Sequence, residues 1–295
     1  MMSDANYLSV VFNSTIRMMT PILYVALGSA LCNRVFIFNI GLEGTMLTGA
    51  FAAIVANYYT GSILVSLLAA MISAMLVSWV AGIFMVKFKG AMLVVGVSIN
   101  MLMAGLTTFL MQTIFGVKGA YVSTDLVSLP KVDVSFLGRW PVLQTMFSSL
   151  TYLDLFAFVL AILLYFFLFK TVTGFHMRSV GINKTAATSL GINADRLQIG
   201  TIAFSGIGAC LLTMGGVTMF AQNITAGRGF IAMAAATLGA AHPLGVVVGS
   251  GFFGFAQSMA NMLQNSAISS QLTMALPYLA TILALAIYNF TQHRR

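Results

Sequence analysis

Residues 62–86 read SILVSLLAAMISAMLVSWVAGIFMV, an apolar run without a single charged side chain. A helix needs about 20 apolar residues to cross the hydrocarbon core of a bilayer, so this stretch predicts a membrane span. Lys87 and Lys89 follow the run directly and mark its end. Further apolar runs predict spans near 8–31, 92–115, 151–170, 198–221, 243–264 and 272–290.

The composition of the chain is that of a membrane protein. Charged residues make up 7% and hydrophobic residues 59% of the 295 residues, whereas a soluble domain carries roughly 25% charged residues. The net charge of +8 comes from bases clustered beside the apolar runs, which is typical of cytoplasmic loops. No basic face with interleaved aromatic residues is visible, so we expect no binding of nucleic acid.

Two apolar blocks, 35–58 and 229–241, are rich in glycine and interrupted by polar residues. Such blocks predict discontinuous or half-length helices, which a membrane tolerates only where protein or a cavity covers the freed backbone. The sequence therefore predicts one all-α transmembrane domain over 1–295, a polytopic bundle of eight to ten spans. The side of the membrane on which the N-terminus lies stays open.

Two polar loops separate the apolar runs. Residues 116–150 carry mixed charges, which suits the external side. Bases dominate residues 171–197, and this excess assigns the loop to the cytoplasm. Within it, Asn183 is a good N-cap and Gly191 a good helix stop, so a short helix is predicted between them. This helix, near 184–190, is either a structured connector or a docking helix for a soluble partner. The candidate docking residues are Asn183, Lys184, Thr185, Ala186, Ala187, Thr188 and Gly191.

A local pattern occurs twice in the chain. Residues 39–50 and 223–236 each have an Asn-Ile pair, then a glycine-rich turn with one charged residue, then a helix of small residues. Such corresponding interruptions in two halves point to a transport pathway at a repeat interface. The charged residues are Glu43 and Arg228, and we predict that they form a structural ion pair near mid-membrane. The alternative is that Glu43 binds solute hydroxyls directly. Asn39 and Asn223 open the two copies.

Further polar residues recur at helical spacing inside apolar runs. Gln257, Asn261 and Gln264 share one face of the run 243–264. Asn100 begins a weaker stripe on 92–115. These residues either line a hydrophilic pathway or hold the bundle together by interhelical hydrogen bonds, and the sequence leaves both interpretations open.

The sequence lacks any arrangement of catalytic residues. It contains neither a phosphate-binding P-loop motif nor a nucleophile elbow, and its three histidines are scattered. Cys32 and Cys210 lie in apolar runs without a cysteine or histidine cluster around them, so no metal site is expected. If ATP drives this protein, another chain must hydrolyse it.

Six stretches of the chain have the form of family signatures. They are NIGLEGTML at 39–47, GAMLVVGVSIN at 90–100, MRSVGINKTAA at 177–187, NITAGRGFIAMAA at 223–235, HPLG at 242–245 and ALPY at 275–278. Together they resemble the binding-protein-dependent permeases for nucleosides and simple sugars. Ser179 and Thr45 depart from that pattern, which usually has Ala and Met at these two positions.

This resemblance implies a subunit of a type II ABC importer in a bacterial plasma membrane. Residues 171–197 would be the loop that couples the permease to its ATPase. The expected partners are a second, longer permease chain, cytoplasmic ATPase subunits that hold ATP and Mg²⁺, and an external substrate-binding lipoprotein. This chain itself would bind no cofactor. Nucleosides are the expected solutes, with simple sugars or another small polar solute as the alternative.

Two other classes of protein are weighed against this interpretation. An ion-coupled secondary transporter needs an intramembrane carboxylate, and Glu43 could serve as one. A membrane-embedded enzyme is disfavoured, because no convergent catalytic residues are visible. Dependence of uptake on a partner ATPase, and its insensitivity to ionophores, would separate the importer from the secondary transporter.

Overall fold

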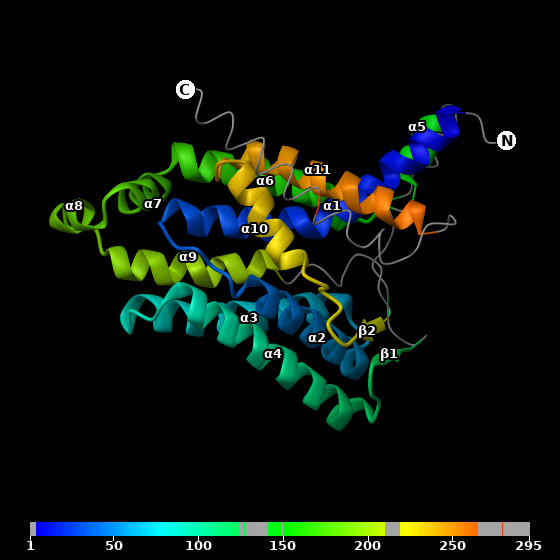
Figure 1. Ribbon diagram of the computed structural model, residues 1–295, viewed down its shortest axis with the longest axis horizontal. Helices are drawn as coiled ribbons and strands as arrows, with labels where there is room; N and C mark the ends of the chain where they lie inside the picture. Colours follow the sequence, from blue (N-terminus) through cyan, green and yellow to red (C-terminus); the bar gives the residue numbers. More distant parts are fainter. Residues whose placement is uncertain are drawn as a thin grey trace.

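The computed structural model describes residues 4–123, 127, 132, 141–148, 150–209, 219–264 and 279. Long helices run side by side in it, as Figure 1 shows. The helices are α1 (Asp4–Arg34), α2 (Leu42–Thr60), α3 (Ile63–Gly82), the π-helix η1 (Ile83–Lys87), α4 (Met92–Phe115), α5 (Pro141–Phe147), α6 (Tyr152–Lys170), α7 (Val172–Ile182), α8 (Lys184–Ser189), α9 (Ala194–Ala209), α10 (Arg228–Leu238) and α11 (Pro243–Leu263). The strands are β1 (Ala120–Val122) and β2 (Met219–Ala221).

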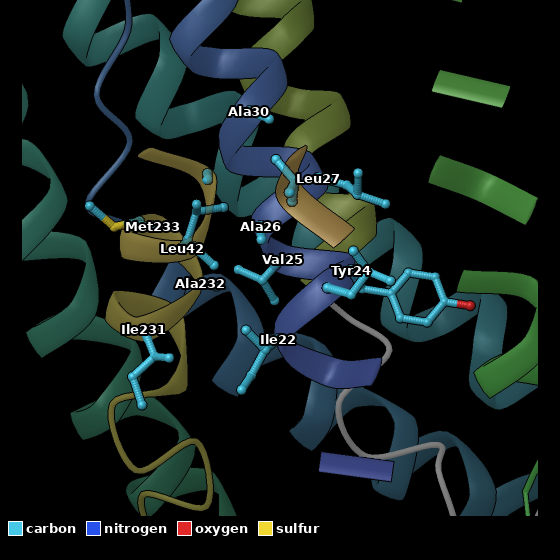
Figure 2. Packing of buried hydrophobic residues seen from close by; sticks show 14 of the residues in the cluster. Ile22, Tyr24, Val25, Ala26, Leu27, Ala30, Leu42, Ile231, Ala232 and Met233 are labelled. Atoms are coloured by element: carbon cyan, nitrogen blue, oxygen red, sulfur yellow. The ribbon is translucent and has the colours of Figure 1, made fainter. Parts of the chain in front are cut away.

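Helix α1 lies at the centre of the bundle. The six residues 22–27 are almost completely buried on every side of the helix, as expected for a helix that is apolar all round. Figure 2 shows Ile22 and Val25 of α1 packed towards Leu42 of α2 and Ile231 of α10. The core therefore joins α1 to both interrupted blocks of the sequence.

The packing of the helices has the pattern of a structural repeat. Helix α1 packs most extensively on α11, and α9 packs most extensively on α3, while α1 and α9 also contact each other. The short helix α10 lies against α1, and α2 lies against α9. The first helix of each group, α1 or α9, thus packs on the third helix of the other group, α11 or α3. The group α1–α2–α3 therefore corresponds to the group α9–α10–α11. The predicted pseudo-repeat is thus present in the arrangement of the helices.

The two ends of the bundle differ in character. Helices α7 and α8 lie at one end, and the connection between α3 and α4 lies at the same end (Figure 1). At the opposite end, β1 and β2 pair antiparallel, with Tyr121 opposite Phe220. The ends match the cytoplasmic and external sides that the charges predict.

The predicted spans compare with the helices as follows. By length and composition, five described helices can cross a membrane: Leu8–Arg34, Ile63–Lys87, Met92–Phe115, Tyr152–Lys170 and Pro243–Leu263. These agree with five of the predicted runs and confirm a polytopic helical bundle.

The remaining predictions fare differently. The run 198–221 is wrong at its end, because 219–221 form a strand whose backbone groups pair with β1. Residues 210–218 lie outside the described part, and so does the predicted span 272–290 except for residue 279. The total of eight to ten spans therefore stays a prediction.

Candidate functional site

Two helices begin inside the bundle instead of at its ends. Residues 37–39 have no regular secondary structure and lead from α1 to α2, whose N-cap is Gly41. The 11-residue helix α10 begins after the turn 222–227, with Gly227 as its N-cap. The beginnings of α2 and α10 meet, because Glu43 in the first turn of α2 contacts the first turn of α10. The prediction of a half-length helix is confirmed for the block 229–241. It is wrong for the block 35–58, where the chain is interrupted only before α2 and α2 then runs continuously for 19 residues.

The carboxylate of Glu43 caps the N-terminus of α10. Its Oε1 accepts a hydrogen bond from the N–H of Gly227 at 2.8 Å, and its Oε2 accepts one from the N–H of Gly229 at 2.7 Å. The side chain is only 9% exposed. Because the first N–H groups of a helix have no partner within it, this carboxylate satisfies two donors that would otherwise be unpaired.

The electrostatics of this position favour an anion. Glu43 belongs to the first turn of α2 and bonds the first turn of α10. Each helix carries a partial positive charge at its N-terminus, and the negative carboxylate lies between the two. A single side chain thus stabilises both helices and joins the two repeats.

Gly229 permits this contact through its lack of a side chain. A Cβ at this position would lie 2.6 Å from Glu43 Oε2 and 2.8 Å from Glu43 Cα. Both separations are too short for non-bonded atoms, and the second involves backbone. Any larger residue at position 229 would push α2 and α10 apart.

Arg228 is adjacent to the site, but it does not form the predicted ion pair. Among the described residues the one ion pair joins Lys184 to Asp195, at 2.7 Å. Both oxygens of Glu43 are instead occupied by the N–H groups that flank Arg228 in the sequence. The two charged positions come together as predicted and their charges interact, but the side chains do not approach each other to salt-bridge distance in this structure.

The two helix beginnings also differ by one position. Arg228 is the first residue of α10, whereas Leu42 is the first residue of α2 and Glu43 the second. The structural counterpart of Glu43 is therefore Gly229. The sequence match aligned the two charges because each is followed by a glycine.

Two asparagines hold the turn before α2. Asn100 accepts from the N–H of Gly44 at 2.8 Å and donates to the carbonyl of Ile40 at 3.0 Å. Asn39 accepts from the N–H of Gly41 and donates to Ser205 Oγ on α9, each at 3.2 Å. The side-chain amides of Asn100 and Asn39 thus bond backbone groups at the break between α1 and α2, where helical hydrogen bonds are missing. A direct contact of either residue with solute stays a prediction.

Asn223 lies in the turn before α10 and has a left-handed backbone, with φ of 58°. Asparagine tolerates this conformation better than most residues. Its carbonyl accepts from the N–H of Ala226 at 3.0 Å, and its side chain is exposed. Asn223 therefore opens the turn that presents Gly227 and Gly229 to Glu43.

The predicted stripe on α11 lies against α1. Gln257 Nε2 donates to Asn261 Oδ1 at 3.3 Å, and Asn261 Nδ2 contacts Met18 Sδ on α1 at 3.5 Å. Gln264 follows the helix and is exposed. In the described residues no hydrogen bond joins this stripe to Glu43. The contact with Met18 favours the interhelical interpretation for Asn261, and a role in the pathway stays a prediction.

The short helix in the basic loop is present as predicted. The Asn183 side chain accepts from the N–H of Ala186 at 3.0 Å and so caps α8. Gly191 follows with φ of 85°, a left-handed conformation that ends the helix. Thr185 and Thr188 are exposed, and Lys184 pairs with Asp195 on α9. The loop is therefore ordered by its own caps.

The two faces of this loop differ sharply. Ala187 is 2% exposed and packs with Val180 of α7 and Ala194 of α9. Ile182 and Leu190 flank α8 and are 88% and 82% exposed. A soluble partner would therefore meet Ile182 and Leu190, and Ala187 holds the loop together from within.

Some contributors to these sites were not predicted from the sequence. The N–H groups of Gly227 and Gly229 and the hydroxyl of Ser205 hold Glu43 and Asn39. Backbone donors leave no mark in a side-chain pattern. A serine within an apolar run, in contrast, is visible in the sequence, and Ser205 interrupts the run 198–221.

Comparisons with known proteins agree with this arrangement. The family described as "Branched-chain amino acid transport system / permease component" matches residues 11–285. The guanosine ABC transporter permease protein NupQ of Bacillus subtilis is 35% identical, over 96% of this chain and 93% of that protein. The nucleoside ABC transporter permease protein NupC of Lactococcus lactis is 31% identical, over 97% and 94%.

The fold also has a counterpart among solved structures. An inward-facing conformation of a metal-chelate type ABC transporter shares it with a TM-score of 0.52 and 18% sequence identity. The match covers 92% of this chain and 85% of that one. With the family matching nearly end to end, the chain belongs to the branched-chain amino acid transport system permease component family.

Proposed function

We propose that this chain is one permease subunit of an ATP-driven importer of nucleosides. The observation that carries the proposal is the meeting of α2 and α10 at Glu43, within a chain of this permease family. Interrupted helices that meet at a repeat interface are typical of transport pathways. The most similar relatives reported above are named for guanosine and nucleoside transport, which supports nucleosides over simple sugars as the solute.

The energy source would lie on another chain. A cytoplasmic ATPase with bound ATP and Mg²⁺ would dock on the loop α7–α8, where Ile182 and Leu190 are exposed outside the bundle. Apolar side chains exposed in this way are costly in water and favourable in an interface. A second, longer permease chain would complete the pathway in a bacterial plasma membrane, and an external lipoprotein would deliver the solute.

The geometry of Glu43 argues against ion-coupled transport. A carboxylate that carries a proton or cation must exchange its partners during each cycle. Both oxygens of Glu43 accept backbone N–H groups that belong to a helix N-terminus. Releasing them would leave the partly buried N–H of Gly227 and the buried N–H of Gly229 unpaired, and an unpaired buried donor costs about 1–3 kcal/mol. Glu43 is therefore better suited to joining the repeats than to carrying an ion.

Uptake of radiolabelled guanosine or uridine by cells that express the chain with its neighbouring transport genes tests the proposal. We expect uptake to disappear when the partner ATPase is inactivated and to persist when an ionophore collapses the membrane potential. Excess unlabelled nucleoside should compete, and excess ribose or glucose should not. Uptake that survives loss of the ATPase would refute an importer, and competition by the sugars alone would refute nucleosides.

A further inference from the structure

The end of α1 is hydrogen-bonded to the loop that carries α8. Gln198 of α9 donates through Nε2 to the carbonyl of Val35 at 2.9 Å, and its Oε1 accepts from Lys184 Nζ at 2.8 Å. Gln198 is 5% exposed. Lys184 is the first residue of α8 and also pairs with Asp195 of α9. One amide thus connects the first residue of α8 with the residue that follows α1.

A second contact reaches the same point from α7. A Cβ on Gly181 would collide with the carbonyl oxygen of Arg34, so the backbone of α7 lies directly against the last residue of α1. Packed backbone of this kind transmits displacement, because close-packed interiors are hardly compressible. Helix α7 therefore contacts the end of α1 directly, and α8 is linked to it through Gln198 of α9.

Arg34 extends this connection to α10. Its Nε donates to the carbonyl of Ala241 at 2.9 Å, and its Nη2 donates to the carbonyl of Ala240 at 3.2 Å. Ala240 and Ala241 have left-handed backbones, with φ of 50° and 51°, in the turn between α10 and α11. The guanidinium therefore holds a strained turn at the C-terminal end of α10.

The helices α2 and α10, whose beginnings meet at Glu43, are both connected to this junction. The segment 35–41 runs from Val35 to the first turn of α2, and α10 runs from Gly227 to the turn that Arg34 holds. We propose that Gln198 and Arg34 are positioning residues, which tie α8 to both helices so that a movement of the loop reaches Glu43. This inference rests on the proposed function, since an ATPase is what would move the loop.

The alternative is that Gln198 only fills space. Methionine has a similar length and fills the same volume without the two directed hydrogen bonds, so Gln198→Met separates connection from packing. Thr201→Val is the matched control. Thr201 lies one turn further along α9, is also buried, and donates only to the carbonyl of Leu197 in its own helix.

The experiment measures nucleoside uptake per ATP hydrolysed by the complete transporter, at equal amounts of assembled complex. We expect Gln198→Met to retain ATP hydrolysis and to lower uptake per ATP about tenfold, within the usual range of coupling between sites. Thr201→Val should leave the ratio unchanged. An unchanged ratio in Gln198→Met, or an equal fall in both variants, would overturn the connection.

Lys184→Met provides the second variant, in case Gln198→Met does not assemble. Lys184 is half exposed, so its replacement needs no repacking of the core. We expect the ratio to fall because the first residue of α8 loses its bonds to α9, and an unchanged ratio would contradict the proposal. Failure of the proposed function looks different, because wild-type uptake would then not depend on ATP at all.

Discussion

Glu43 Oε2 accepts the backbone N–H of Gly229 at 2.7 Å, and a Cβ on Gly229 would lie 2.6 Å from that same oxygen. The two repeats of the bundle are thus joined by a side chain of one and the bare backbone of the other. Such a contact depends on negative charge at residue 43 and on the absence of a side chain at residue 229. No hydrogen bond between the side chains of Glu43 and Arg228 contributes to it.

Glu43→Gln should weaken the joint between the repeats. The amide offers one acceptor oxygen to two N–H groups, and its own NH₂ faces a donor. We expect a loss of about 1.5–3 kcal/mol, the usual value of a hydrogen bond to a charged group. The measurement is the thermal stability of the purified permease in detergent, together with uptake in cells. Arg228→Gln should cost less stability, because no hydrogen bond from Arg228 to Glu43 is lost.

The charge swap separates a helix cap from an ion pair. Glu43→Arg combined with Arg228→Glu should not recover stability or uptake, because a guanidinium cannot accept the N–H groups of Gly227 and Gly229. Partial recovery in the double variant, relative to Glu43→Arg alone, would show that the two side chains pair after all.

Gly229→Ala should disrupt the site without changing any charge. The added methyl group collides with the backbone of Glu43, so we expect about 1–3 kcal/mol of destabilisation from overpacking and loss of uptake. Gly105→Ala on α4 is the control, since a Cβ there meets nothing within 4 Å. The control should be neutral or slightly stabilising, because alanine favours helix over glycine. Equal effects of the two substitutions would contradict the close approach.

The sequence could predict that Glu43 and Arg228 come together, but not how. Two interrupted apolar blocks with the same Asn-Ile start are a sufficient signal for paired interrupted helices. The signal carries no information about backbone N–H groups, and the most obvious partner for a buried acid is a base. The sequence also could not predict that Glu43 faces Gly229. A short match between the two blocks does not resolve a shift of one residue between the beginnings of α2 and α10.

The loop 171–197 likewise has some features that the sequence predicts and others that it does not. The helix caps of this loop depend on residue type alone, so Asn183 and Gly191 could be identified as caps from the sequence. Which face of a six-residue helix is buried depends on α7 and α9, and small residues such as Ala186 and Ala187 give no amphipathic pattern. The structure buries Ala187 and exposes Ala186.

Leu190→Asp should therefore prevent docking of the ATPase while the permease still folds. Leu190 is exposed and loses no contact in the core, whereas a charge there opposes burial in an interface. We expect co-purification of the ATPase to fall and the melting temperature of the permease to stay unchanged. Leu190→Met is the matched control and should keep both.

Ala187→Arg tests the opposite face. It should destabilise the loop itself, because the side chain would enter the contact with Val180 and Ala194. Selective loss of docking in Ala187→Arg, with a normal melting temperature, would place the interface on that face instead.

Cysteine substitution on α11 decides between a pathway and a packing role for the polar stripe. Gln257 and Asn261 are partly buried and bonded to each other, and Asn261 also contacts Met18, whereas Gln264 is exposed beyond the helix. In a background without Cys32 and Cys210, a water-soluble thiol reagent should label residue 264 fastest and residue 261 slowest. If the stripe only joins α11 to α1, nucleoside and ATP should change none of these rates. A rate at 257 or 261 that rises with ATP would show that this face opens during transport, and Asn261→Leu should then reduce uptake without reducing assembly.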